Sequence, residues 1–169
     1  VLTEDDALNR RIEAAFSQWA HRIGLPAKLR TMRMAKSTDG ETFAVLTGNG
    51  AIPGPVKLDV FLVEADRVTT PHLKMMDENT IDGIELDAYG NPARYYILRY
   101  HPGDLRATLD DFDTIGAESV IHWFRTDRPG QHRGVPEITP ALPLFAQLRR
   151  YTLAVLGAAE TAADFAAVL

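Results

Sequence analysis

The chain has 169 residues, of which 46% are hydrophobic and 24% charged, so it is long enough for one globular domain, or two small ones, with a sizeable core. A formal net charge of −5 gives no overall argument for nucleic-acid binding, although it does not exclude local basic patches. The absence of cysteine excludes disulfides and thiolate chemistry, and neither an apolar run of membrane-spanning length nor a signal peptide is visible.

Two helices are predicted before Gly40. Thr3 is the expected N-cap of the first helix, acidic residues fill its first turn, and Gly24 is expected to end it. Pro26 suits the first turn of the second helix, which should end near Ser37. The first helix carries one apolar stripe at three- and four-residue spacing, formed by Leu8, Ile12, Phe16, Trp19 and Ile23.

Residues 41–125 predict a β-rich segment. The runs "ETFAVLT", "VKLDVFLVEA" and "SVIHWFR" are rich in β-branched and aromatic residues and predict strands. The run "GIELDAYGNPARYYILRYHPG" predicts a hairpin with its turn from Tyr89 to Pro92. Because helices precede these strands and a long helix follows them, the order favours an α+β fold with a mostly antiparallel sheet.

Two kinds of loop could suggest a ligand site. The run "GNGAIPG" superficially resembles a phosphate-binding loop, but it lacks the Gly-Lys-Ser/Thr ending and no helix follows, so a plain turn is predicted. The acidic runs "DENTIDG" and "LDDFD" lack the alternating oxygen ligands and closing glutamate of a calcium loop. Both acidic runs are therefore predicted to be solvated loops.

The five histidines, at positions 21, 72, 101, 122 and 132, do not show the spacing of a zinc site. A hydrogen-bonded structural role is predicted for His122, and no G-x-S-x-G elbow supports nucleophilic catalysis. No catalytic, cofactor-binding or metal residue is assigned. An alternative stays open, in which the chain is a small phage or bacterial hydrolase that uses His122 or His132 with Asp127. A monomeric binding module is a further alternative.

A basic run on the second predicted helix contains Lys28, Arg30, Arg33 and Lys36. A solvated helix face is the favoured interpretation for an acidic protein. Contact with phosphates or with an acidic neighbour is the functional alternative.

A long alanine-rich helix is predicted from about Pro136 to Leu169, with Pro140 and Pro143 breaking or kinking its first part. At 1.5 Å per residue it would be about 40 to 50 Å long, and it is apolar nearly all round. We expect other parts of a longer chain, or neighbouring subunits, to shield it. The start at Val1 and the uncapped helical end likewise lead us to expect a piece of a longer chain.

Several segments together resemble the lambda-family portal proteins of tailed bacteriophages. They are "GIELDAYGNPARYYILRYHPGD", "ESVIHWFRTDRPGQHRGVPEITPAL" and the long helix with "AETAADFAA", preceded by "LVEADRV". The resemblance is specific from Leu62 to Leu169 and weaker over the first two helices. It departs from the family at Glu137 and Thr139, where a bulky apolar residue is frequent.

The resemblance implies a structural role rather than catalysis, with no cofactor. Family members form a dodecameric ring at one capsid vertex of the virion after assembly in the host cytoplasm. DNA passes through the axial channel, and the ring docks the terminase, head-tail connector proteins, and capsid or scaffold protein. The chain would be a single fragment, helical over 1–40, β-rich over 41–125, and formed of a loop and the long helix over 126–169. It would hold part of the wing region, with the last helix leading towards the stem.

The loop "RTDRPGQHRG" carries three arginines against one acid. We expect Arg128 and Arg133 to tie this loop to a neighbouring subunit or to the C-terminus of its own helix.

Overall fold

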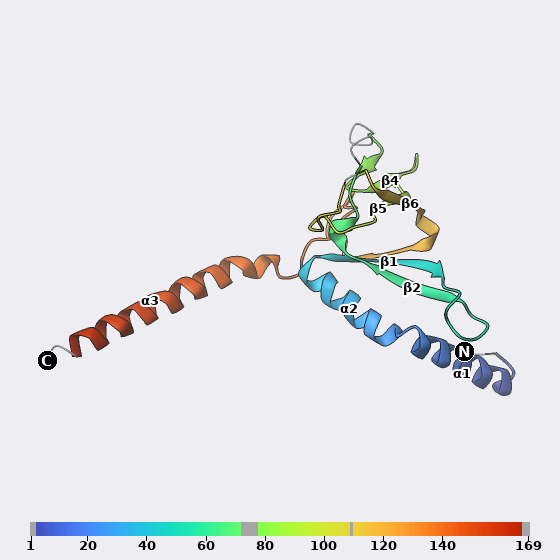
Figure 1. Ribbon diagram of the computed structural model, residues 1–169, viewed down its shortest axis with the longest axis horizontal. Coiled ribbons are helices and arrows are strands. Elements are labelled where there is room, and N and C mark those ends of the chain that lie inside the picture. Colours follow the sequence, from blue (N-terminus) through green and yellow to red (C-terminus); the bar gives the residue numbers. More distant parts are fainter. Residues whose placement is uncertain (1–2, 72–77, 109, 167–169) are drawn as a thin grey trace. The chain divides into compact units, whose positions relative to one another are not determined.

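The computed structural model describes residues 3–71, 78–108 and 110–166 (Figure 1). The chain divides into two compact units, Val1–Pro136 and Glu137–Leu169, here called unit 1 and unit 2. Unit 1 combines helices with two antiparallel sheets, and unit 2 contains one long helix, so the predicted α+β class is confirmed.

Unit 1 contains all the strands that the structure describes. In chain order its elements are α1 (Asp6–Arg22), α2 (Leu25–Thr38), β1 (Glu41–Gly48), β2 (Leu58–Val63), the 3-10 helix η1 (Ala65–Arg67), β3 (Thr80–Ile81), β4 (Ile84–Leu86), β5 (Pro92–Leu98), β6 (Phe112–Gly116), the 3-10 helix η3 (Ala117–Ser119) and β7 (Val120–Phe124).

Helix α1 begins two residues later than its sequence suggests. Asp5 is the N-cap, because its carboxylate accepts hydrogen bonds from the amides of Ala7 (2.8 Å) and Leu8 (3.1 Å), so the prediction of Thr3 is wrong. The helix ends as predicted, since Gly24 adopts the left-handed conformation with φ of 65°.

The first sheet has the strand order β2-β1-β7, and both pairings of β1 are antiparallel. Residues 41–45 of β1 are all buried, because this central strand is covered on both faces. Phe43 and Val45 face the second sheet, and Ala44 faces α2, where it belongs to the same core as Met32 of that helix. The burial of both faces explains why the strand reads as a continuous apolar run rather than an alternating one.

The second sheet has the order β3-β4-β5-β6, and the predicted hairpin is β4–β5. Its turn is closed by Asp87, whose carboxylate accepts 2.8 Å hydrogen bonds from the amides of Tyr89 and Asn91. The prediction of solvated loops is wrong in part, because "DENTIDG" contributes β3 and "LDDFD" contributes the start of β6. Residues Asp77 and Leu109 of these runs lie outside the described residues.

Two acidic residues around the start of β6 form ion pairs with the arginine that follows β5. Arg99 donates to Asp111 (3.0 Å) and to Asp113 (2.9 Å) across the loop that joins β5 to β6. The acids are therefore paired along an exposed edge of the hairpin, where such pairs contribute little stability.

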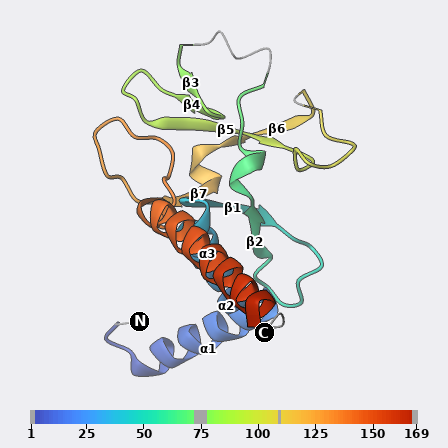
Figure 2. The same ribbon diagram turned by 90° about the vertical axis from the view of Figure 1, so that its left-hand side faces the viewer.

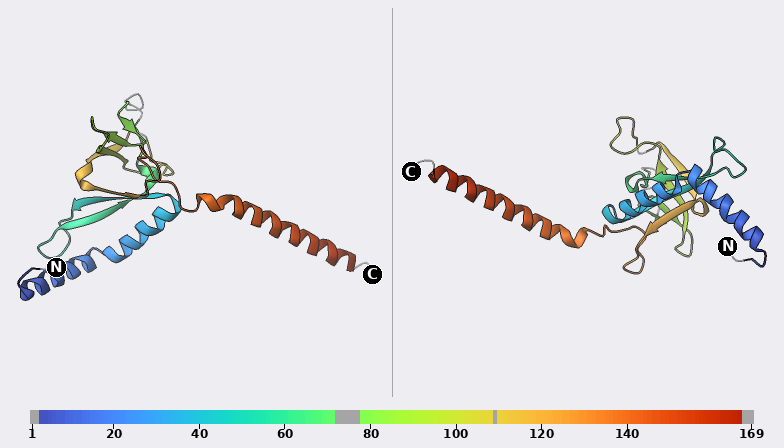
Figure 3. Two further views of the ribbon diagram at one scale, coloured as in Figure 1. Left: turned by 180° about the vertical axis from the view of Figure 1, so that it is seen from behind. Right: turned by 90° about the horizontal axis from the view of Figure 1, so that it is seen from below.

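Unit 1 has three layers. Figure 2 shows β5 and β6 above β1 and β7, and Figure 3 shows α2 along the opposite side of β1 and β2. One apolar core fills the space between the sheets, and a second lies between the first sheet and the helices. The buried residues of the first core are Phe43, Val45, Val63, Val68, Ile84, Tyr95 and Ile97, and those of the second are Ile23, Met32, Ala44, Ile52 and Val60.

Unit 2 contains the 3-10 helix η4 (Thr139–Ala141) and α3 (Leu142–Ala166). Pro140 lies in η4 and Pro143 in the first turn of α3, where proline is tolerated, so the two prolines mark the start of the α-helix rather than a break within it. The 25 described residues of α3 span about 37 Å, and the helix begins at Leu142 rather than at Pro136.

Large apolar side chains are exposed along the whole of α3, by 48% at Val155 and by 70% at Phe165. Charges are sparse on this helix, so its surface is unusually apolar for one that faces solvent. Within the described residues, no helix has both the length and the apolar character needed to cross a membrane.

Candidate functional site

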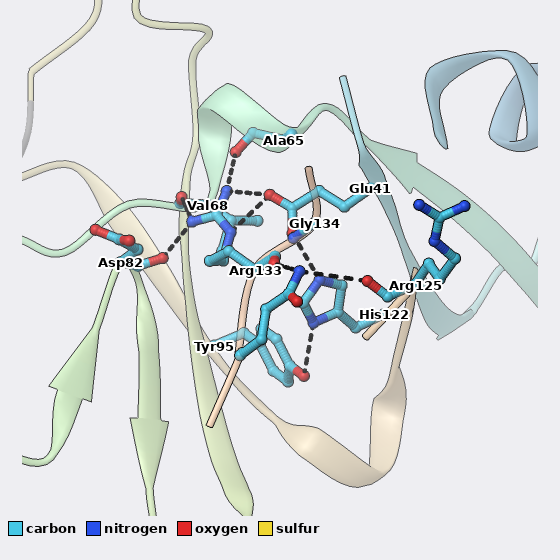
Figure 4. Close-up of polar contacts among 10 residues, drawn as sticks. Glu41, Ala65, Val68, Asp82, Tyr95, His122, Arg125, Arg133 and Gly134 are labelled. Carbon is cyan, nitrogen blue, oxygen red and sulfur yellow. Dashed lines mark hydrogen bonds and ion pairs between the residues drawn. The ribbon is translucent and has the colours of Figure 1, made fainter. Parts of the chain in front are cut away.

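Glu41, the first residue of β1, is a buried carboxylate with only 4% of its side chain exposed. It accepts hydrogen bonds from His122 Nε2 (2.8 Å), Arg133 Nε (2.6 Å) and the Gly134 amide (2.8 Å), as Figure 4 shows. A buried carboxylate is costly unless such partners satisfy it. These four residues, called the Glu41 cluster, join the start of β1 to two segments that lie more than 80 residues further along the chain.

The sheet register positions His122 next to Glu41. His122 pairs with Phe43, and Phe124 pairs with Glu41, so all four side chains lie on one face of the sheet. The imidazole stacks between Phe43 and Phe124, with ring centroids 4.1 Å and 4.4 Å apart. Nε2 faces Glu41, and Nδ1 lies 3.5 Å from the Tyr95 hydroxyl. His122 is thus buried and hydrogen-bonded, in agreement with the structural role predicted for it.

Arg133 joins several segments of unit 1. Besides Glu41, its guanidinium donates to the carbonyls of Val68 (3.0 Å) and Ala65 (3.2 Å) and to that of Asp82 (Figure 4). Its charged end also lies 5.5 Å from the centroid of the Phe43 ring. One side chain thus ties the first sheet to η1 and to the turn between β3 and β4. The expectation that Arg133 reaches a neighbouring subunit or a helix C-terminus is wrong, because its donors are used inside unit 1.

Gln131 closes the loop that leads to Arg133. Its side-chain amide donates to the carbonyls of Arg125 (3.3 Å) and Arg133 (2.8 Å), and its oxygen accepts from the Asp127 amide (2.9 Å). The loop therefore satisfies its own backbone through one glutamine and presents Arg133 to the Glu41 cluster.

Two glycines allow the backbone to approach Glu41. A Cβ atom on Gly134 would overlap the carbonyl of Gly40, and one on Gly40 would overlap Val135. Gly40 also has φ of 92°, a conformation that other residues rarely adopt. The Gly134 amide reaches the buried carboxylate because neither glycine has a side chain.

The Glu41 cluster changes the proton affinities of its titratable groups. Burial alone raises the pKa of Glu41, but hydrogen bonds from His122 and Gly134 and the charge of Arg133 outweigh it and hold the pKa below its usual value. Burial lowers the pKa of His122, although Glu41 opposes this shift, and burial raises the pKa of Tyr95. At neutral pH the cluster therefore combines an ionised Glu41, a neutral His122 and a charged Arg133.

This arrangement is suited to holding the fold together rather than to a reaction. Each oxygen of Glu41 accepts hydrogen bonds, so the carboxylate has no free position for a substrate. The proposed hydrolase set is not brought together: the carboxylate of Asp127 is bound by Arg125 (2.7 Å and 3.1 Å), and both side chains are exposed. Across the described part of the chain, no hydrogen bond links His132 to His122 or to Asp127.

The other predicted residues are dispersed. In the basic run, Lys28 binds Asp59 at 2.6 Å and Lys36 lies 5.9 Å from the centroid of the Trp123 ring, so these two cations are already engaged. Arg128 lies on the exposed loop, where its expected role stays a prediction. His72 lies outside the described residues.

A pocket of about 370 Å³ opens beside Glu41 and Arg133, lined also by Asp39, Glu64, Asp66 and His101. The imidazole of His101 lies 3.6 Å from Glu64 and 3.7 Å from Asp66, and all three side chains are well exposed. Within residues 3–71, 78–108 and 110–166, no group of three or more metal-ligating side chains is arranged to hold an ion.

Sequence reasoning missed Glu41 and Tyr95. One weak signal was available: Glu41 begins a strand whose middle residues are apolar, and an acidic residue buried there would require a cationic partner. The partner could not be chosen from the sequence, because 18 lysines and arginines are available.

Comparison with known proteins gives two findings. The family model described as phage portal protein, lambda family, matches residues 1–169. The "Probable portal protein" of Halomonas phage phiHAP-1 is 28% identical over 142 residues, which cover 77% of this chain and 27% of that protein. The chain thus spans about a quarter of the length of this relative.

Proposed function

Because this chain belongs to the lambda family of phage portal proteins, we propose that it is a structural subunit of a portal ring and not an enzyme. The observation that carries this proposal is the family match over residues 1–169. The structure adds support, because residues of the loop that carries the family resemblance stabilise the fold. Gln131 closes the loop, Arg133 binds Glu41 of β1, and Gly134 allows the loop backbone to lie against the Gly40 carbonyl.

The surface of α3 supports assembly with other copies. Its exposed aromatic and aliphatic side chains, such as Phe145 and Tyr151, leave a long apolar surface that water solvates poorly. In a ring, neighbouring subunits or the remainder of the full protein would cover this helix. A dodecamer built from heterologous contacts closes on itself and leaves an axial channel.

The same role implies the partners. The ring would occupy one capsid vertex of the virion, after assembly in the host cytoplasm, and would pass DNA during packaging and ejection. Terminase, head-tail connector proteins, and capsid or scaffold protein would dock on it. The chain would act as a single piece of the wing region, helical over 1–40, β-rich over 41–125, with residues 126–169 leading towards the stem.

The test uses the complete protein. Mass photometry and negative-stain electron microscopy should show closed rings of about twelve subunits, as the proposed cyclic assembly requires. A stable monomer at assembly concentrations would contradict the proposal and would favour the monomeric binding module. Hydrolase activity lost on substitution of Asp127 would instead favour the enzyme.

A further inference from the structure

Residues 125–136 leave β7 and return to the start of β1 without forming a helix or a strand. Hydrogen bonds within the segment hold its first part, chiefly through Gln131. Its contacts with the rest of unit 1 gather at the returning end, where Arg133 and Gly134 bind Glu41. The segment is therefore secured mainly at its returning end, by Glu41 and by the carbonyls of Ala65, Val68 and Asp82 that Arg133 also binds.

We propose that Glu41 and Arg133 form a latch, and that residues 131–136 open and close as a unit around it while the two sheets stay folded. The latch consists of the bonds from Arg133 and Gly134 to Glu41, with the bonds from Arg133 to its three carbonyls. Because residues 131–136 directly precede unit 2, the latch controls how firmly the chain leading into that unit is held.

The β1–β7 ladder does not depend on this latch. Its register runs from Glu41 opposite Phe124 to Val45 opposite Val120 and contains no residue of the returning segment. His122 belongs to the ladder, so its hydrogen bond to Glu41 persists when Arg133 and Gly134 leave. Opening therefore breaks side-chain and loop contacts but leaves the strand pairing intact.

Opening also leaves Glu41 with a route to water. The pocket beside it is about 370 Å³ and is bordered by exposed side chains of Glu64, Asp66 and His101. Water that enters this pocket can solvate the released carboxylate and the carbonyls that Arg133 had bound. Local opening should consequently cost less free energy than unfolding of unit 1.

Native-state amide exchange in low urea tests the latch in the unmodified chain. The Gly134 amide, which is bonded to Glu41, should exchange faster than the amides of β5 and with almost no dependence on urea. The β5 amides should show the steep urea dependence of global unfolding. Equal rates and equal slopes for Gly134 and β5 would overturn the proposal, because the segment would then open only when unit 1 unfolds.

A pair of matched variants tests which side chain closes the latch. Arg133→Met should raise the exchange rate of Gly134 by about tenfold or more and keep its shallow urea slope, because several hydrogen bonds of the closed state are lost. Arg128→Met, the same change on the exposed part of the loop, should leave that rate unchanged. The proposal fails if the two variants behave alike.

Glu41→Gln and Arg133→Lys cover the case in which Arg133→Met does not fold. Both keep a polar side chain of similar size, and Lys also keeps the charge, but neither reproduces the forked contacts of Arg133 with the carboxylate. Each should raise the Gly134 exchange rate relative to Arg128→Met. Wild-type exchange in both would show that the Glu41–Arg133 bond does not close the segment.

Discussion

Arg133 and Glu41 are 92 residues apart in the sequence, and their side chains meet at 2.6 Å in a largely buried ion pair. The pair lies at the edge of the core between the two sheets, where Phe43 packs against both His122 and the Arg133 guanidinium. A buried charge without its partner destabilises the folded state by far more than the intact pair stabilises it. Removal of either residue would therefore leave the other as an uncompensated buried charge.

Glu41→Ala should lower the free energy of unfolding of unit 1 by about 3 kcal/mol. The change leaves Arg133 without its counter-charge and removes the acceptor for His122 and Gly134. Urea denaturation followed by fluorescence measures the loss. The control is Asp127→Ala, which breaks an exposed ion pair with Arg125 and should cost less than about 1 kcal/mol. Equal losses would show that Glu41 has no special role.

Acid should destabilise unit 1 through His122. Its pKa is lowered in the folded state, so the unfolded chain binds more protons as the pH falls below the ordinary histidine value of 6.5. The free energy of unfolding therefore decreases through this window, and the lowered pKa of Glu41 extends the decrease below 4.5. His122→Gln should flatten the slope below pH 6.5, measured by urea denaturation at each pH. A slope below pH 6.5 that is the same in His122→Gln and in the wild type would contradict this role of His122.

Local pattern was sufficient to predict most of the secondary structure. The end of α1 at Gly24, the apolar run of β1 and the hairpin turn next to Asp87 all follow from neighbouring residues, and the structure confirms them. The N-cap at Asp5 was missed because Thr3, two positions earlier, is also a favoured cap residue. Strand β6 was missed because its acids pair with Arg99, a contact that sequence spacing does not reveal.

Only part of the Glu41 cluster could be predicted from the sequence. The sequence identified the loop with Arg133 as important and His122 as a structural residue. It could not assign Glu41 as their shared partner, because that contact depends on which strands are neighbours in the sheet. The same limitation explains why Arg133 was assigned to a contact outside its own unit.

Gly134→Ala should destabilise unit 1 by about 1–3 kcal/mol, because the new Cβ would overlap the Gly40 carbonyl and displace the Gly134 amide from Glu41. The cost is steric, since Gly134 does not require a left-handed backbone. Gly50→Ala is the matched control, because a Cβ there meets no atom within 4 Å. Thermal denaturation should show a lower Tm for the first variant alone, and a Tm equal to the control would contradict the close approach.

The apolar surface of α3 should affect assembly rather than folding. Leu148→Gln combined with Leu156→Gln removes two side chains that are 60% and 54% exposed, and glutamine has a helix propensity close to that of leucine. In the complete protein we expect unchanged helicity by circular dichroism but a clear loss of rings by mass photometry, because the covering contacts lose apolar area. Glu160→Gln on the same helix is the control and should assemble normally. Normal rings from the double variant would show that subunits do not cover this part of α3.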